Sequence, residues 1–430
     1  MPYRYRVVAL LFLLLLVMYF DRLCIAVAGP RIQQDLHLDA KAWSWVLSAF
    51  NIAYMLFEIP SGRLGDRIGQ RKVLTRIVLW WSAFTVATGL AAGLPQLLLT
   101  RFLFGMGEAG AFPNSSAVIG RWVPASERAR ATGIMWTAAA LGGMLTPLIV
   151  VPVQQAYGWR ASFYIFGSLG VFWAGLWYWW FRNSPAEMSE VSATELAAIG
   201  EPAPAAKHSL PWGQILGNGN FIRLMLMYHS YCWGASFFLS WYPTYLQRGR
   251  GLTEDQMKIA SGLPFWVSLG CMVAGGYLSD RLARTQSLRI ARCAVGAGGL
   301  IVSGVCVAIA LATKDNTIAV ALLTVGGGAM NMMIPVSWSI CLDLAHGNAG
   351  AVSGAMNTAG QFGSLLCGLA IGYLVEWTGS YDLALTPLAA ALVISGLLFA
   401  WIDPSRPLIP EADISPLPPM DRVAPASAHS

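Results

Sequence analysis

The chain has 430 residues, of which 56% are hydrophobic and 12% charged, and its formal net charge is +6 at pH 7. A soluble domain carries about 25% charged residues, so this chain lacks the charge to cover a water-exposed surface and is not an ordinary soluble protein. The modest net charge does not indicate a nucleic-acid partner, because in a membrane protein the placement of positive residues matters more than their sum.

Apolar segments follow one another along the chain, and each is about as long as the roughly 20 residues that a helix needs to cross a bilayer. The segments lie near residues 5–28, 43–62, 73–93, 95–119, 129–153, 161–181, 221–246, 257–279, 290–313, 316–341, 350–375 and 383–402. Only helices and closed barrels satisfy backbone groups in lipid, and these continuous runs favour helices. We therefore expect an all-α polytopic membrane protein with 12 transmembrane helices.

A long polar stretch after the sixth segment divides the chain into two sets of six. The predicted parts are an N-terminal six-helix bundle over 1–181, a central cytoplasmic loop over 182–220, a C-terminal six-helix bundle over 221–402 and a disordered cytoplasmic tail over 403–430. The sequence Gly-x-x-x-Asp-Arg follows the second segment of each half, at 62–67 and 276–281. Parallel repeats of this kind are common in transporters, whose substrate site lies between the halves near the bilayer midplane.

Arginine and lysine are more frequent in the loops on one side of the predicted spans, which places both termini in the cytoplasm. The loop that follows the second segment contains Arg63, Arg67, Arg71, Lys72 and Arg76. The loop near 248–258, on the other side, also holds positive residues and weakens the contrast. The seven cysteines are scattered singly, so we expect neither disulfides nor a metal site.

Asp21, Arg22, Arg101 and Glu108 are the four charged residues of the predicted spans best placed for a central site. An ionisable group inside a span costs about 2.5–3.5 kcal/mol on insertion scales and is by default a functional hypothesis. Arg101 and Glu108 are seven residues apart, so they face the same way, roughly 10 Å apart along one helix. Asp21 and Arg22 diverge by about 100°, so that one can face a cavity while the other packs between helices. A buried ion pair that fixes helix register is the alternative interpretation.

Amide side chains in the eleventh segment are further candidates for a substrate site. Asn357 and Gln361 are four residues apart and share one helical face, where they can bind hydroxyl groups or, alternatively, join neighbouring helices. Ser337 and Trp338 of the tenth segment are weaker candidates. His229 of the seventh segment is another weak candidate, and packing is the favoured interpretation for this residue.

The sequence GRLGDRIGQRK at 62–72 resembles the loop signature of the major facilitator superfamily. The matching residues are Gly62, Asp66, Arg67, Gly69, Arg71 and Lys72, and the second copy retains Gly276, Asp280 and Arg281. The resemblance covers about residues 5–402 and implies the major facilitator fold, two six-helix bundles that alternate in access. It also implies that the loop motif acts as a latch between the halves, with Asp66 near a helix N-terminus. Alternatively, the positive residues of the loop motif only orient the chain in the membrane, and the motif can also serve both roles.

Two stretches, YFDRLCIAVAGP and RFLFGMGEAGAFPNS, are similar to the anion:cation symporter family, which includes bacterial galactonate, glucarate and hexuronate permeases. The matching positions are Asp21, Arg22, Arg101, Gly105, Gly107, Glu108, Pro113 and Asn114. The resemblance implies that Glu108 and Asp21 are the proton sites. It also implies that Tyr54 contacts a substrate hydroxyl, although a core tyrosine is equally consistent. Arg22 and Arg101 suit the binding of a carboxylate, because a guanidinium group grips it bidentately.

We therefore expect a proton-coupled symporter of a small organic anion in the bacterial inner membrane, a sugar acid such as an aldonate, hexuronate or aldarate. It would be a monomer in the lipid bilayer and would need no cofactor other than the coupling proton. Aromatic carboxylates of the phthalate or hydroxyphenylacetate type are alternative substrates, and anion exchange or facilitated diffusion are alternative modes. A membrane enzyme or a sensor is a remote alternative, because the five histidines are scattered and no nucleophile motif or signalling domain is present.

Overall fold

The structure is a computed structural model that describes residues 2–124, 127–199, 212–345, 349–406 and 408. The described part of the chain is helical and contains no strand. The first half comprises α1 (Tyr3–Asp35), α2 (Ala40–Ile68), α3 (Gln70–Gly89), α4 (Leu94–Glu108), α5 (Ala111–Trp122), α6 (Arg128–Tyr157) and α7 (Trp159–Trp180). Short helices follow in the connecting stretch, namely η2 (Pro185–Glu187), α8 (Ala193–Ile199) and α9 (Trp212–Ile215).

The second half begins with one long helical segment whose winding changes along its length. This segment comprises α10 (Gly219–Ser236), η3 (Phe237–Trp241), α11 (Tyr242–Thr244) and η4 (Tyr245–Gly249), of which η3 and η4 are π-helical. The helices that follow are α12 (Glu254–Leu282), α13 (Leu288–Ala312), α14 (Asn316–Ala329), η5 (Met330–Met332), α15 (Met333–Ala345), α16 (Ala349–Thr378), α17 (Tyr381–Ala384) and α18 (Thr386–Ala400).

Each apolar segment identified in the sequence coincides with a helix or with consecutive helices of the structure. Seven of the helical segments in the described residues are long and apolar enough to cross a membrane, by length and composition. The fourth segment is broken in two, because α4 ends at Glu108 and α5 begins at Ala111. Gly110 lies between them with a φ of 92°, a left-handed conformation that glycine adopts without steric penalty.

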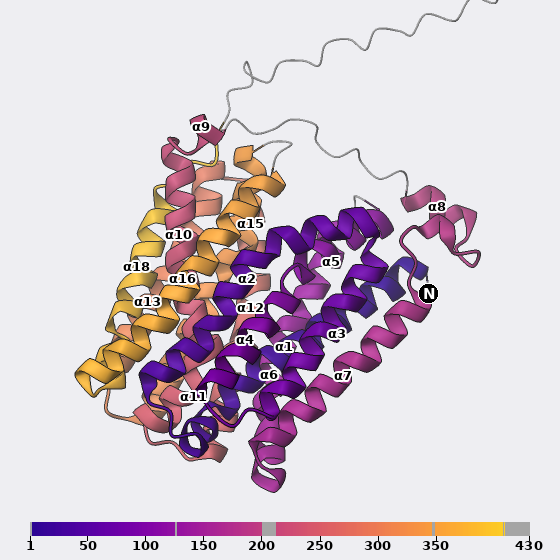
Figure 1. The fold of residues 1–430 in the computed structure, drawn as a ribbon. Helices are drawn as coiled ribbons and strands as arrows, with labels where there is room; N and C mark the ends of the chain where they lie inside the picture. Colours follow the sequence, from indigo (N-terminus) through magenta and orange to yellow (C-terminus); the bar gives the residue numbers. More distant parts are fainter. Residues whose placement is uncertain (1, 125–126, 200–211, 346–348, 407, 409–430) are drawn as a thin grey trace, which may run out of the picture.

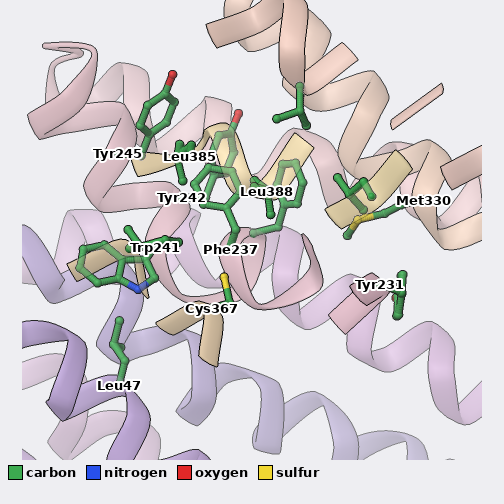
Figure 2. Packing of buried hydrophobic residues seen from close by; sticks show 14 of the residues in the cluster. Leu47, Tyr231, Phe237, Trp241, Tyr242, Tyr245, Met330, Cys367, Leu385 and Leu388 are labelled. Carbon is green, nitrogen blue, oxygen red and sulfur yellow. The ribbon is translucent and has the colours of Figure 1, made fainter. Parts of the chain in front are cut away.

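The two halves pack against each other along several pairs of helices. The pairs include α2 with α16, α6 with α12, and α1 with α11, and Figure 1 shows α2 and α16 running beside each other at the centre of the molecule. Figure 2 shows Tyr242 beside Leu385, in an apolar cluster that also includes Phe237, Trp241 and Leu47 of α2. Apolar packing therefore continues across the boundary between the halves.

Polar contacts join the halves at one end of the molecule, where α1 ends and α2 begins, which we call the distal face. Arg31 of α1 donates two hydrogen bonds to Glu254 of α12, at 2.7 and 2.6 Å. Gln154 of α6 donates to the same carboxylate at 2.5 Å. Arg248 of η4 donates to Gln33 of α1 at 3.0 Å. The distal face is thus closed by charge-assisted hydrogen bonds. We call the other end, where α1 begins and α18 ends, the termini face.

Candidate transport site

The centre of the first half contains a buried ion pair between Arg22 of α1 and Glu108, the last residue of α4. The Nε of Arg22 donates to Oε1 of Glu108. Glu108 is fully buried, whereas 16% of the Arg22 side chain is exposed. The guanidinium group lies within 6 Å of four aromatic ring centroids, those of Phe50 and Tyr54 (5.0 Å each), Tyr19 (5.8 Å) and Phe112 (5.9 Å). Aromatic faces attract a cation, so these rings offset part of the desolvation of Arg22.

The geometry of this pair depends on close approach between α4 and its neighbours. A Cβ atom on Gly105 would lie 2.5 Å from the backbone oxygen of Phe50, so only glycine lets α4 pack this closely on α2. The helix then ends directly after Glu108, because Gly110 takes its left-handed conformation two residues later. The carboxylate is therefore carried at a break between α4 and α5 rather than in the middle of a continuous helix.

Arg101 lies two turns before Glu108 on α4, and 3% of it is exposed. Its guanidinium carbon is 4.5 Å from the ring centroid of Phe104 and 5.4 Å from that of Phe50. In the described part of the structure, its Nε has no hydrogen-bond partner. A buried donor without a partner is rare in proteins and calls for an explanation, such as a ligand that binds there.

Asp21 is buried on the other side of α1 from the ion pair, beside Trp81 and Thr85 of α3. Both of its carboxylate oxygens lack a hydrogen bond of normal geometry among the described residues. The neighbours Asp21 and Arg22 thus point in different directions, as expected for consecutive residues of a helix. Asp21 still lies within electrostatic range of Glu108 and Arg101, so the four groups form one buried cluster.

A hydrogen bond across the boundary between the halves lies next to this cluster. Nδ2 of Asn357 in α16 donates to both carboxylate oxygens of Glu58 in α2, at 3.0 and 3.2 Å. Glu58 follows Tyr54 by one turn and lies close enough to Arg22 to feel its charge. The sequence pattern predicted Asn357 as a site residue but not Glu58. The available signal was a glutamate inside the predicted span 43–62, one turn after Tyr54.

The positions of the remaining predicted site residues do not distinguish a substrate contact from a packing role. Tyr54 is buried and faces Arg22, which is consistent both with a substrate contact and with a core role. Gln361 is half-buried one turn after Asn357. Ser337 is buried and donates to the backbone oxygen of Ile334 at 2.9 Å, and Trp338 is 37% exposed. His229 lies with Nδ1 3.2 Å from the backbone oxygen of Ala359, a contact that suits packing between α10 and α16.

The described residues of the loop motif make their contacts within their own half. Arg71 donates to the backbone oxygen of Tyr178 at 2.8 Å, and Asp280 pairs with Arg292 at 3.2 Å. Gly69 has a φ of 86° and forms the turn between α2 and α3. Gly62 is half-buried, and Arg67 and Arg281 are exposed at the termini face. The side chain of Asp66 lies outside the described residues.

Comparison with known proteins places this arrangement in context. A profile described as Major Facilitator Superfamily matches residues 11–368. A relative from Cupriavidus necator, named a probable sulfoacetate transporter, is 35% identical over 93% of this chain and 94% of its own. The hexuronate transporter of Bacillus subtilis is 30% identical over 94% of this chain and 95% of its own. A D-galactonate transporter of Escherichia coli is 28% identical, over 92% of this chain and 94% of its own.

The fold also resembles solved structures. A bacterial homologue of the human lysosomal transporter Spinster, solved in an inward-facing and unoccupied conformation, has a TM-score of 0.71 to this structure. The likeness covers 93% of this chain and 95% of the homologue, and the sequences are 20% identical, so it concerns the fold alone.

Proposed function

Because this chain belongs to the Major Facilitator Superfamily and is a membrane transporter rather than an enzyme, we propose that it is a proton-coupled symporter of a small organic anion. The observation that carries the proposal is the buried ion pair between Arg22 and Glu108. The carboxylate of Glu108 already binds the guanidinium group that an anionic substrate needs. Binding of the substrate to Arg22 must therefore be linked to loss of the ion pair between Arg22 and Glu108.

The linkage works through a proton. A proton that adds to Glu108 neutralises the carboxylate and frees Arg22 to bind the carboxylate or sulfonate of a substrate, since charge-assisted hydrogen bonds are about twice as strong as neutral ones. When the substrate leaves, Arg22 is again uncompensated, and Glu108 releases its proton to restore the pair. Proton and anion therefore travel in the same direction.

Arg101 and Asp21 complete the site in this proposal. Arg101, whose Nε has no partner in the described structure, offers a second guanidinium group to the anion. Asp21 is the second proton-binding carboxyl, because its carboxylate is buried and has no paired cation among the residues that the structure describes. Tyr54, Asn357 and Gln361 would contact oxygen atoms of the substrate.

Alternating access follows from the arrangement of the halves. We propose that the helical segments form 12 transmembrane helices in two bundles, and that the termini face is cytoplasmic at the bacterial inner membrane. The closed distal face then corresponds to a state in which the site communicates with the cytoplasm. The loop motif would latch the termini face when the distal face opens, and the protein would act as a monomer.

The substrate we propose is a sugar acid, an aldonate, hexuronate or aldarate, because several relatives of similar length carry such acids by name. A short sulfonate or carboxylate dianion is the second candidate. It is favoured by the 35% identical relative named for sulfoacetate and by the aromatic rings around Arg22, which contribute few groups for hydroxyls.

The test is uptake into proteoliposomes that contain the purified full chain, with an acidic exterior and a neutral lumen. The panel comprises D-galactonate, D-glucuronate, D-glucarate, sulfoacetate and phthalate. We expect one class to accumulate above its external concentration and the accumulation to collapse with a protonophore. Uptake that needs an internal anion and ignores the protonophore would instead identify an exchanger and contradict the proposal.

A further inference from the structure

We propose that Glu58 is a further proton-binding carboxyl of the transport site, which holds Asn357 while it is ionised and releases that amide to the anion when it is protonated. This inference rests on the function proposed above and adds a residue with no assigned role. It starts from a contact that joins the two moving halves, the hydrogen bonds from the Asn357 amide to both oxygens of Glu58.

The contact between Glu58 and Asn357 lies far from the hydrogen bonds that close the distal face. Glu58 is 18 residues along α2 from its distal start at Ala40, which corresponds to about 27 Å of helix. Asn357 is eight residues into α16, so it lies about 12 Å from the start of that helix at the termini face. The contact therefore spans the halves on the termini side of the buried cluster, where a substrate that leaves towards that face must pass.

The count of charges around the cluster gives Glu58 its role. Asp21, Glu58 and Glu108 contribute three carboxyl groups, whereas Arg22 and Arg101 contribute two guanidinium groups. Arg22 is already bonded to Glu108, and the partner of Glu58 is a neutral amide. With all groups ionised the cluster carries one negative charge in excess, and a bound dianion such as sulfoacetate or glucarate would raise the excess to three. Protons on Glu108 and Asp21 offset two of these charges. Unpaired buried charge is costly, so a proton on Glu58 is the available compensation for the third.

The other groups around Glu58 do not supply that compensation. On its own helix Tyr54 is neutral, on α4 Glu108 is negative, and on α16 Asn357 is neutral. Arg76 of α3 donates to Ser61, one turn further along α2, and does not reach the carboxylate of Glu58. Arg22 of α1 acts on Glu58 only at a distance, without a hydrogen bond in the described structure.

The hydrogen bond itself provides the switch. An ionised Glu58 accepts hydrogen bonds from the amide of Asn357, as the carboxylate of a substrate would. Protonation removes the charge that strengthens this bond, and an oxygen of the anion replaces Glu58 as the acceptor. The proton comes from water on the side from which the substrate enters, and it leaves Glu58 after the anion has departed on the other side.

The first experiment needs no substrate. Infrared difference spectra are recorded for the full-length protein in lipid nanodiscs while the pH is lowered. We expect Glu58→Gln to lack one protonated-carboxyl band that the unsubstituted protein gains, and Asn357→Ala to shift the frequency of that band. A Glu58→Gln spectrum identical to that of the unsubstituted protein would overturn the inference.

The second experiment counts protons per substrate from reversal potentials in proteoliposomes, with a transported dianion of the panel, namely D-glucarate, sulfoacetate or phthalate. We expect Glu58→Gln to move one proton fewer per anion, Glu58→Asp to restore the count, and the exposed control Glu376→Gln to leave it unchanged. An unchanged count in Glu58→Gln overturns the inference and leaves the proposed function intact. Failure of the unsubstituted protein to transport any acid of the panel would instead contradict the proposed function, and the infrared spectra would still decide the role of Glu58.

Discussion

The closed distal face provides a prediction whose size follows from the structure. Arg31 makes three hydrogen bonds to the other helices there, two to Glu254 at 2.7 and 2.6 Å and one to the backbone oxygen of Gln154 at 2.9 Å. The Arg31 side chain is 37% exposed and that of Glu254 is 18% exposed. Such a site lies between an exposed pair, worth about 0–1 kcal/mol, and a buried one, worth about 3–5 kcal/mol when broken.

We therefore expect Arg31→Ala to destabilise the closed distal face by about 2 kcal/mol, which is roughly a 30-fold shift in the ratio of closed to open molecules. The matched control is Lys258→Gln, which removes an ion pair of similar chemistry that lies within α12 alone. Only the contact between halves should change the equilibrium between conformations.

The assay is the distance distribution between spin labels at Tyr157 of α6 and Leu383 of α17, which are 79% and 60% exposed and lie in different halves. The labels are introduced as cysteines after the seven native cysteines are replaced. We expect a longer distance to gain population in Arg31→Ala and not in Lys258→Gln. A distribution in Arg31→Ala that superposes on that of the unsubstituted background would refute the reasoning.

Three further changes test other parts of the structure. Gly105→Val places side-chain atoms against the backbone of Phe50, so we expect a loss of about 1–3 kcal/mol, seen as a lower midpoint of thermal unfolding. Arg22→Lys keeps the charge but loses the planar fork, so we expect at least a roughly tenfold rise in the substrate concentration for half-maximal uptake, and an unchanged value contradicts the role of Arg22. The hydrogen bond from Arg4 holds the pKa of Glu127 below its ordinary value of 4.5. The contact between Arg4 and Glu127 therefore stabilises the fold above pH 4.5, and this stabilisation is lost as the pH falls through the lowered pKa of Glu127. The difference in melting temperature between Glu127→Gln and the unsubstituted protein should accordingly vanish in acid.

Long apolar runs made the helical segments predictable, because a bilayer demands about 20 such residues for each crossing. The divergence of Asp21 and Arg22 was predictable as well, since it follows from the helical repeat. The break after Glu108 was not predictable, because the run GMGEAG contains three glycines and the sequence does not say which of them takes the positive φ; in the structure it is Gly110, which lies against Ser61 of α2.

Contacts between the halves were beyond the reach of sequence periodicity. Glu58 and Asn357 are 299 positions apart, and Arg31 and Glu254 are 223 apart. Helical repeats specify which residues share a face of one helix, but the register between α2 and α16 depends on how both bundles pack. The glutamate in the predicted span 43–62 was the only sequence signal for Glu58, and its importance became visible only with its partner Asn357.

The most direct measurement of the central claim is accumulation driven by a proton gradient in proteoliposomes that contain either the unsubstituted protein or Glu108→Gln. The account predicts that the unsubstituted protein concentrates its anion in the lumen, whereas Glu108→Gln only equilibrates it or exchanges it for the same anion inside. If Glu108→Gln still concentrates the anion to the same level, the pair between Arg22 and Glu108 does not couple the proton to the substrate, and the account is contradicted.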